Sequence, residues 1–241
     1  CQFNETLGLQ RDGCLSERFA IHYTQVYGSR SLSLPELALV EPMSVGYHAA
    51  NRGRVSEVDT VLVIGCGTVG MGAVAASARK GATVIAVDVD EAKLALATRF
   101  GAQHTIDATK QEVAAQVTWL TEGEGVRVAI EAVGLPQTFR LAVEAACFAG
   151  RVVYVGYAKE QVCYDTTLFV RKELEIYGSR NALRAFPGVI KMMEQGQQPF
   201  GELVSRVYAL EETGQALADW HANPARFAKI LIDARPDRGD R

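Results

Sequence analysis

Between residues 60 and 178 the sequence alternates between short apolar runs, rich in β-branched residues, and longer amphipathic stretches. The runs that predict strands are Val61–Ile64, Thr83–Val87, His104–Ile106, Val126–Ile130, Arg151–Val155 and Leu174–Tyr177. The stretches that predict helices are Val69–Arg79, Glu91–Phe100, Gln111–Thr121 and Gln137–Cys147. Strands that alternate with helices predict an α/β fold, in which a parallel sheet carries helices on both faces. The strands are almost uniformly apolar. This supports a parallel sheet covered by helices, because both faces of such a sheet are buried.

Three glycines lie where the first predicted strand passes into the first helix, in the segment Gly65-Cys66-Gly67-Thr68-Val69-Gly70. In a GxGxxG segment the first glycine makes a tight turn and the second lets the backbone approach a pyrophosphate. The third allows close packing of the helix on the strand. A phosphate would then lie on the N–H groups of the helix N-terminus, where the helix dipole favours negative charge. The segment predicts a doubly wound Rossmann sheet that binds a dinucleotide.

An acidic residue, Asp88, ends the second predicted strand, 23 positions after Gly65. A carboxylate at this place can accept hydrogen bonds from the ribose hydroxyls of the adenosine, and it repels a 2′-phosphate. We therefore expect NAD as the cofactor rather than NADP. The alternative is an aspartate that only forms a turn or caps the helix before Asp90-Glu91.

A competing class is the S-adenosylmethionine-dependent methyltransferases, whose glycine motif is similar to residues 61–70 and which also use an acid after the second strand. Those enzymes usually have an acidic residue in the place of Val63. Their glycines also lie closer together, without the extra residue that places Gly70. Both differences favour the dinucleotide-binding interpretation.

Composition limits the possible partners and the compartment. The net charge is −3 with acidic and basic residues interleaved, which gives no support for nucleic-acid binding. No apolar run reaches the roughly 18 residues that a membrane span needs. The five cysteines are scattered and form no CxxC pair, so they do not indicate a secreted disulfide framework. We expect a cytoplasmic protein that acts on a small molecule.

The two ends of the chain have weaker patterns. Residues up to Gly28 are turn-rich with short apolar runs and predict β structure with loops. Pro35–Ala50 predicts a helix that is broken near Pro42. After Gly178 we expect a helix, a strand, a helix and a last strand, at Leu183–Glu194, Val204–Tyr208, Glu211–Trp220 and Ala228–Ile232.

Several segments resemble the medium-chain zinc-containing alcohol dehydrogenases, and among them the sorbitol, threonine and sugar-acid dehydrogenases. The similar segments cover essentially the whole chain. They are Leu7-Gly8-Leu9-Gln10-Arg11-Asp12-Gly13, Glu41-Pro42 with Gly46 and His48-Ala49, Gly101-Ala102, Glu131-Ala132-Val133-Gly134, Val155-Gly156, and Gly178-Ser179-Arg180-Asn181-Ala182.

The resemblance implies roles for individual residues. Glu41 corresponds to the glutamate near the catalytic zinc, which ligates the metal directly or through water. Lys93 corresponds to a basic residue at the adenosine ribose, and Cys1 to the last of four structural-zinc cysteines. With the glycine segment, the residues implied to bind the cofactor are Gly65, Gly67, Thr68, Val69, Gly70, Asp88, Lys93, Val133, Val155, Gly156 and Arg180. His48 is implied to support the site or pack beside it.

The resemblance also implies the organisation and the activity. Residues 1–45 are expected to be the last part of a β-rich, GroES-like catalytic domain, residues 46–182 the Rossmann domain, and residues 183–241 a return to the catalytic domain. The other zinc ligands of the family precede Cys1, so the chain alone would close neither zinc site. The intact enzyme is expected to oxidise a secondary alcohol with NAD and zinc, as a homodimer or homotetramer. Residues 1–241 alone are expected to bind NAD without turnover, and a non-catalytic NAD-binding fragment is the alternative.

Overall fold

The computed structural model of the chain describes residues 2–3 and 5–235, except for the side chain of Ala225. The described residues form two compact units. One is Ser29–Gly201, and the other combines Cys1–Gly28 with Glu202–Arg241. The predicted boundaries at residues 45 and 182 stay predictions.

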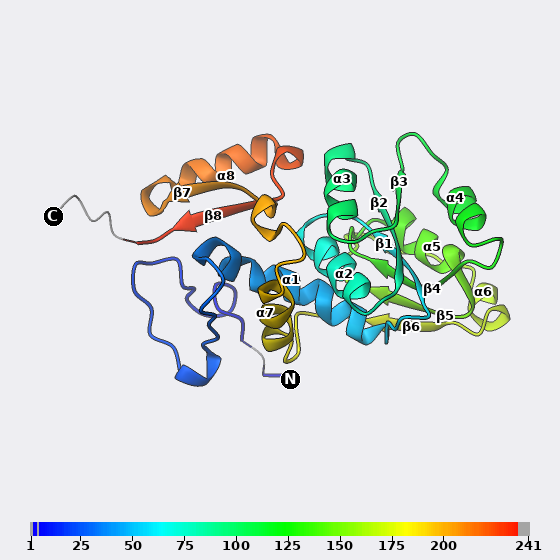
Figure 1. Cartoon of the computed structure of the whole chain (residues 1–241), viewed down its shortest axis with the longest axis horizontal. Helices are drawn as coiled ribbons and strands as arrows, with labels where there is room; N and C mark the ends of the chain where they lie inside the picture. The colour runs from blue at the N-terminus through cyan, green and yellow to red at the C-terminus, as the bar shows by residue number, and fades with distance from the viewer. Residues whose placement is uncertain (1, 4, 236–241) are drawn as a thin grey trace. The chain divides into compact units, whose positions relative to one another are not determined.

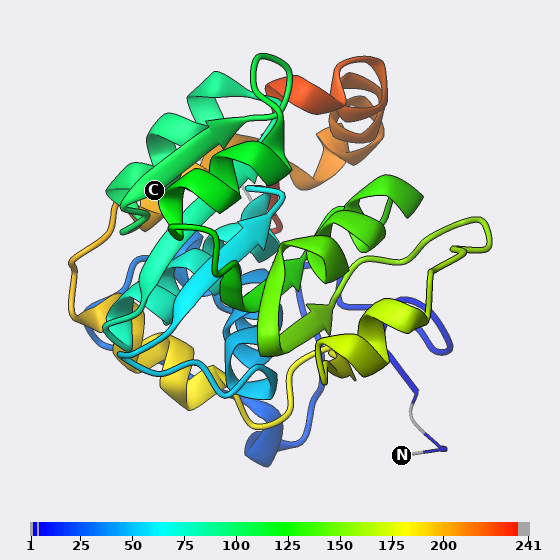
Figure 2. The same cartoon turned by 90° about the vertical axis from the view of Figure 1, so that its right-hand side faces the viewer.

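The larger unit is built on a six-stranded sheet in which every neighbouring pair is parallel, in the order β3-β2-β1-β4-β5-β6 (Figures 1 and 2). This order is that of the doubly wound Rossmann fold. The strands are β1 Thr60–Ile64, β2 Thr83–Asp88, β3 His104–Asp107, β4 Val126–Glu131, β5 Ala146–Tyr154 and β6 Glu175–Gly178. All six predicted strands are confirmed, with bounds that shift by one or two residues except at the start of β5.

Helices cover both faces of this sheet (Figure 2). Because side chains alternate along a strand, Leu62 and Ile64 of β1 join one apolar cluster with residues of α4 and α5. Val63 points to the other face, where its side chain lies against the backbone of α2 at Gly70. The helices of this unit are α1 Leu34–Arg52, α2 Thr68–Arg79, α3 Glu91–Arg99, α4 Val113–Leu120, α5 Pro136–Ala145, α6 Thr167–Arg171 and α7 Phe186–Glu194.

The predicted break near Pro42 is wrong, because α1 runs through Pro42 without interruption. A proline inside a helix removes one hydrogen bond and costs about 3 kcal/mol. Here tertiary packing offsets that cost. Leu39 and Met43 on either side of Pro42 are fully buried. A Cβ on Gly46 would lie 2.0 Å from the Val69 carbonyl oxygen, so α1 and α2 touch backbone to backbone.

The smaller unit contains two parallel strands joined through a helix: β7 Val204–Ala209, α8 Thr213–Ala222 and β8 Lys229–Asp233. These confirm the predicted strand, helix and strand at the carboxyl end. The β structure expected before Gly28 is not formed among the described residues there, which show one isolated bridge between Leu7 and Arg11 and a short 3-10 helix, Tyr23–Gln25. A strand needs a neighbouring strand to satisfy its N–H and C=O groups, and the apolar side chains of this segment are exposed.

No helix within the described residues is both long enough and apolar enough to cross a bilayer.

Candidate functional site: the glycine loop and the carboxyl ends of the strands

The turn between β1 and α2 has the geometry that the three glycines predict. Gly65 has a φ of +94°, a conformation that side chains disfavour. A Cβ on Gly70 would lie 1.7 Å from the Gly65 carbonyl oxygen, so only a glycine lets α2 begin this close to β1. Gly67 differs from both, because a Cβ there would meet nothing within 4 Å. The loop therefore packs tightly on its inner side and leaves open space outside Gly67.

The open space lies at the N-terminus of α2. Gly67 is the N-cap residue and provides no side-chain cap, while Thr68 is buried behind it. The N-terminus of a helix attracts anions through its N–H groups and its dipole. Gly67, Thr68 and Val69 lie together at this helix N-terminus, and the space that a Cβ on Gly67 would fill is open.

Asp88 ends β2 beside this loop. Its Oδ2 accepts a hydrogen bond from the Cys66 N–H at 2.6 Å, and its Oδ1 accepts from the N–H groups of Val89 at 2.8 Å and Asp90 at 3.1 Å. A carboxylate has about four lone-pair positions. One therefore stays available, enough for one ribose hydroxyl without displacing the backbone. Asp90 rather than Asp88 is the N-cap of α3, so Asp88 does not cap this helix. Its bonds to the N–H groups of Val89 and Asp90 are those of a turn-forming aspartate, which is the other half of the structural alternative.

Lys93 lies on the first turns of α3, with its ammonium 4.0 Å from the Asp90 carboxylate. Its charge also acts on Cys66 in the glycine loop. Burial, and then the negative charge of Asp88, raise the pKa of the Cys66 thiol far above its usual range. Cys66 is consequently a protonated packing residue and not a nucleophile.

A second set of predicted residues follows β4 and β5. Val133 is 45% exposed, and its Cγ2 would lie 2.6 Å from a Cβ on Gly65. The Val155 N–H donates to the Glu131 carbonyl oxygen at 2.9 Å, and Gly156 donates to the same oxygen at 3.3 Å. The loops after β1, β4 and β5 are therefore in direct contact. The structure brings these residues together with the glycine loop at the carboxyl edge of the sheet.

Arg180 and Glu41 have exposed side chains on other segments. Arg180 follows β6, after Ser179, whose N–H donates to the Tyr154 carbonyl oxygen at 2.8 Å. Glu41 lies in the middle of α1, two turns before His48. Burial, and then the neighbouring Arg52, lower the pKa of His48.

The described residues do not make a zinc site. Nowhere in residues 2–3 and 5–235 do three His, Cys, Asp or Glu side chains lie together as metal ligands. Cys1, the predicted structural-zinc ligand, lies outside the described residues. Glu41 is thus a single carboxylate, whereas a catalytic zinc takes about three protein ligands.

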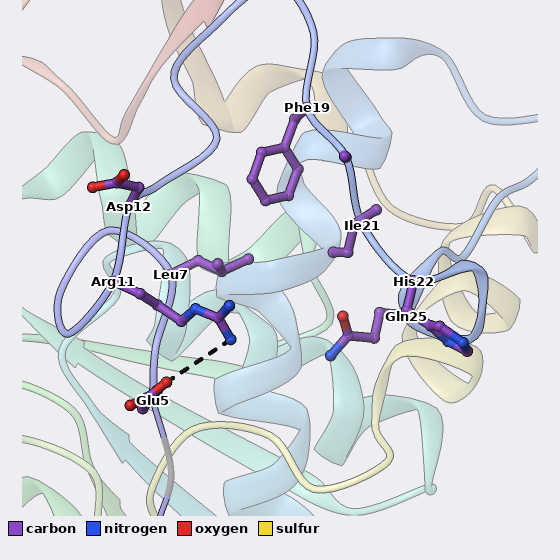
Figure 3. Close-up of a pocket in the computed structure, with 9 residues that line it drawn as sticks. Glu5, Leu7, Arg11, Asp12, Phe19, Ile21, His22 and Gln25 are labelled. Atoms are coloured by element: carbon purple, nitrogen blue, oxygen red, sulfur yellow. Dashed lines mark ion pairs between the residues drawn. The ribbon is translucent and has the colours of Figure 1, made fainter.

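The smaller unit contains a hollow of about 550 Å³ (Figure 3). Arg11 and Gln25 project toward each other across it, and Arg11 lies 3.9 Å from Glu5 in an exposed ion pair. The lining residues are all partly or fully exposed, so no polar group there is held away from water. They are Glu5, Leu7, Arg11, Asp12, Phe19, Ala20, Ile21, His22 and Gln25.

Sequence reasoning did not select Glu131 as a site residue. It ends β4 as Asp88 ends β2, so an acid stands at the carboxyl end of each strand that flanks β1. The Glu131 side chain is fully buried. An acidic residue directly after an apolar strand was the available signal.

The sheet order and the glycine loop at its centre define a Rossmann-type α/β protein. The sequence profile of the zinc-binding dehydrogenases matches residues 68–195, which is more than half of the chain. The chain belongs to this family, the medium-chain zinc-type alcohol dehydrogenases. Family membership leaves the methyltransferase alternative without support.

Individual relatives agree with this assignment. An NAD-dependent alcohol dehydrogenase of Sulfurisphaera tokodaii is 30% identical over 96% of this chain and 68% of its own length. Sorbitol dehydrogenase of Bacillus subtilis is 33% identical over 78% of this chain and 54% of its own. The solved structure of galactitol-1-phosphate dehydrogenase from Escherichia coli has a TM-score of 0.82 at 27% identity, and covers 90% of this chain and 66% of that one. The chain thus spans between about half and two thirds of the length of these proteins.

Proposed function

We propose that this protein is an NAD-dependent oxidoreductase that oxidises a secondary alcohol of a polyol, sugar acid or similar compound by hydride transfer. The observation that carries the proposal is the joint geometry of the glycine loop and Asp88. Three relatives support it: an NAD-dependent alcohol dehydrogenase, a sorbitol dehydrogenase and a galactitol 1-phosphate 5-dehydrogenase. When bound, NAD supplies the hydride acceptor.

The residues of this chain would bind and orient the cofactor. The pyrophosphate would lie outside Gly67 at the N-terminus of α2, and one ribose hydroxyl would donate to Asp88. Lys93 would lie at the same ribose. Val133, Val155, Gly156 and Arg180 would line the nicotinamide half, because the second half of a Rossmann sheet binds the second mononucleotide. Zinc belongs to this proposal for the intact enzyme only, with Glu41 at or near the metal, since the described residues do not supply a ligand set.

The cofactor preference is tested with a matched pair of substitutions. Asp88→Asn removes the charge that would face a 2′-phosphate, whereas Asp107→Asn removes an equivalent charge from the register neighbour on β3. Dissociation constants for NAD⁺ and NADP⁺ are measured by calorimetry. We expect wild type and Asp107→Asn to prefer NAD⁺, and Asp88→Asn to lose much of that preference. Equal or tighter binding of NADP⁺ by the wild type would refute the choice of NAD.

For residues 1–241 alone we propose nucleotide binding without alcohol oxidation, because Glu41 is the one candidate zinc ligand among the described residues. The assay measures NADH absorbance with a panel of polyols and sugar acids, together with metal analysis of the purified chain. Stoichiometric zinc, or turnover that a chelator abolishes, would contradict this proposal.

We also propose a homodimer or homotetramer formed through β6. This strand is the last in the sheet, and one of its edges has no neighbour among the described strands. Exposed strand edges tend to pair with other chains unless they are covered. Light scattering at micromolar concentration should show at least a dimer, and a monomer would refute the proposal.

A further inference from the structure

Glu131 carries an uncompensated carboxylate inside the sheet's carboxyl edge. Its Oε1 accepts hydrogen bonds from the N–H groups of Val133 at 2.8 Å and Gly134 at 2.7 Å. The Thr138 hydroxyl lies 2.8 Å from the same oxygen. These partners are all uncharged groups.

The second oxygen of this carboxylate is an orphan. Oε2 is buried and has no hydrogen-bond partner among the described residues. It lies where a side chain on Gly156 would begin, because a Cβ on Gly156 would be 2.5 Å from Oε2. A buried polar atom without a partner is costly, so it points to a role beyond stability. The backbone of Gly156, in the loop after β5, therefore lies directly against this oxygen.

This charge lies next to residues of the proposed nicotinamide half. The N–H groups that it holds belong to the turn carrying Val133, and Val133 packs on Gly65 of the glycine loop. Gly156 closes the other side. The inner wall of the proposed nicotinamide site is therefore made of backbone that lies directly over the buried Glu131 carboxylate. In such a low-dielectric place a charge acts strongly on a neighbouring ring.

We propose that Glu131 sets the redox preference of the bound cofactor, by favouring the cationic nicotinamide of NAD⁺ over the neutral ring of NADH. This inference rests on the proposed function. The carboxylate attracts the oxidised ring and does not attract the reduced one, so it lowers the reduction potential of the bound couple and weakens retention of NADH. Asp88 sits at the adenosine half, whose charge is the same in both forms, and cannot have this effect.

The test measures dissociation constants of the full chain for NAD⁺ and NADH separately. Glu131→Gln keeps the size of the side chain and removes its charge. We expect the ratio of the NAD⁺ constant to the NADH constant to rise about tenfold, which corresponds to about 30 mV for a two-electron couple. The control is Thr138→Val, which removes the hydroxyl beside Oε1 and leaves the charge. It should leave the ratio unchanged even if it weakens both constants.

A purely structural role gives a different result. If Glu131→Gln changes both constants by the same factor, or if Thr138→Val changes the ratio as much, the inference is overturned. A second pair of variants replaces Glu131→Gln should that variant not fold. Glu131→Met also removes the charge at similar size and should raise the ratio, while Glu131→Asp keeps the charge and should leave the ratio near that of the wild type. Wild type that binds neither dinucleotide would refute the proposed function itself.

Discussion

The ion pair between Asp59 and Arg151 gives a prediction whose size follows from burial. The Asp59 side chain is 1% exposed and the Arg151 side chain 15%. Arg151 also donates to the carbonyl oxygens of Gly53 at 2.8 Å and Arg54 at 3.0 Å. The other carboxylate oxygen of Asp59 accepts from the N–H of Ser56 at 2.8 Å and from its hydroxyl at 2.9 Å. The pair thus ties the end of α1 to β5, beside the start of β1.

Asp59→Asn should destabilise the larger unit by about 3 kcal/mol. Breaking one partner of a buried pair costs about 3–5 kcal/mol, because the remaining charge stays buried without compensation. The lower end applies here, since Arg151 keeps two carbonyl acceptors and some contact with water. For a unit of this size the loss lowers the melting temperature by about 6–12 °C. The ion pair between Arg54 and Glu175 serves as an exposed control, because their side chains are 56% and 46% exposed. Glu175→Gln should cost less than about 1 kcal/mol.

The assay is urea unfolding followed by fluorescence. Trp119 lies in the larger unit and Trp220 in the smaller one, so a Trp220→Phe background reports the larger unit alone. Arg151→Met and the double variant complete a double-mutant cycle. The double variant should cost at least about 1 kcal/mol less than the sum of the two single variants. Strict additivity, or a cost below about 1 kcal/mol for Asp59→Asn, would refute the reasoning.

Three further predictions follow from single positions. Gly46→Ala should cost more than about 2 kcal/mol in urea unfolding, because its Cβ would lie 2.0 Å from the Val69 carbonyl oxygen and force α1 away from α2. Gly214→Ala on α8 is the matched control, since a Cβ there meets nothing within 4 Å, and it should stabilise by up to about 1 kcal/mol. Hydrogen bonds from the Thr109 hydroxyl and N–H, and then Lys110, lower the pKa of Asp107 from 3.8 to about 2. A lowered pKa gives stability above pH 3.8 that is lost as the pH falls toward 2, so Asp107→Asn should flatten that part of the acid-unfolding curve.

The fold of the larger unit was predictable because its signals are local. Six apolar runs, each of strand length, together with the amphipathic stretches between them, predict the sheet without any knowledge of distant contacts. The start of β5 was not predictable in this way. Ala146 and Cys147 continue the apolar pattern of α5, yet α5 ends at Ala145 and Ala146 pairs with Val126 of β4. A tertiary contact decides that boundary.

The same distinction separates the parts of the site. Asp88 was predictable because a known spacing links it to Gly65. Glu131 carries the weaker signal of an acid at the end of an apolar strand. Its burial and its oxygen without a partner among the described residues are not reported by any spacing in the sequence. The predicted break at Pro42 was wrong because the rule that proline interrupts a helix considers only local structure. It takes no account of the packing of α1 on α2, which holds the helix together. The exposed segment before Gly28 carries strand-like residues that have no strand to pair with among the described residues.

The division of the chain into units has a consequence for the order of folding. The unit Ser29–Gly201 is continuous, whereas the smaller unit joins Cys1–Gly28 to Glu202–Arg241. Closing an unfolded loop of roughly 170 residues costs on the order of 4–5 kcal/mol of chain entropy, plus a constant. If Ser29–Gly201 folds first, its residues are no longer a flexible loop when the smaller unit forms. The chain entropy of closing that loop has then already been lost in folding the larger unit. During synthesis the residues up to Gly28 leave the ribosome before Glu202, so their contacts with the segment that begins at Glu202 form only after Ser29–Gly201 has been made. The contacts between the two segments of the smaller unit therefore form later than the contacts within the continuous unit Ser29–Gly201.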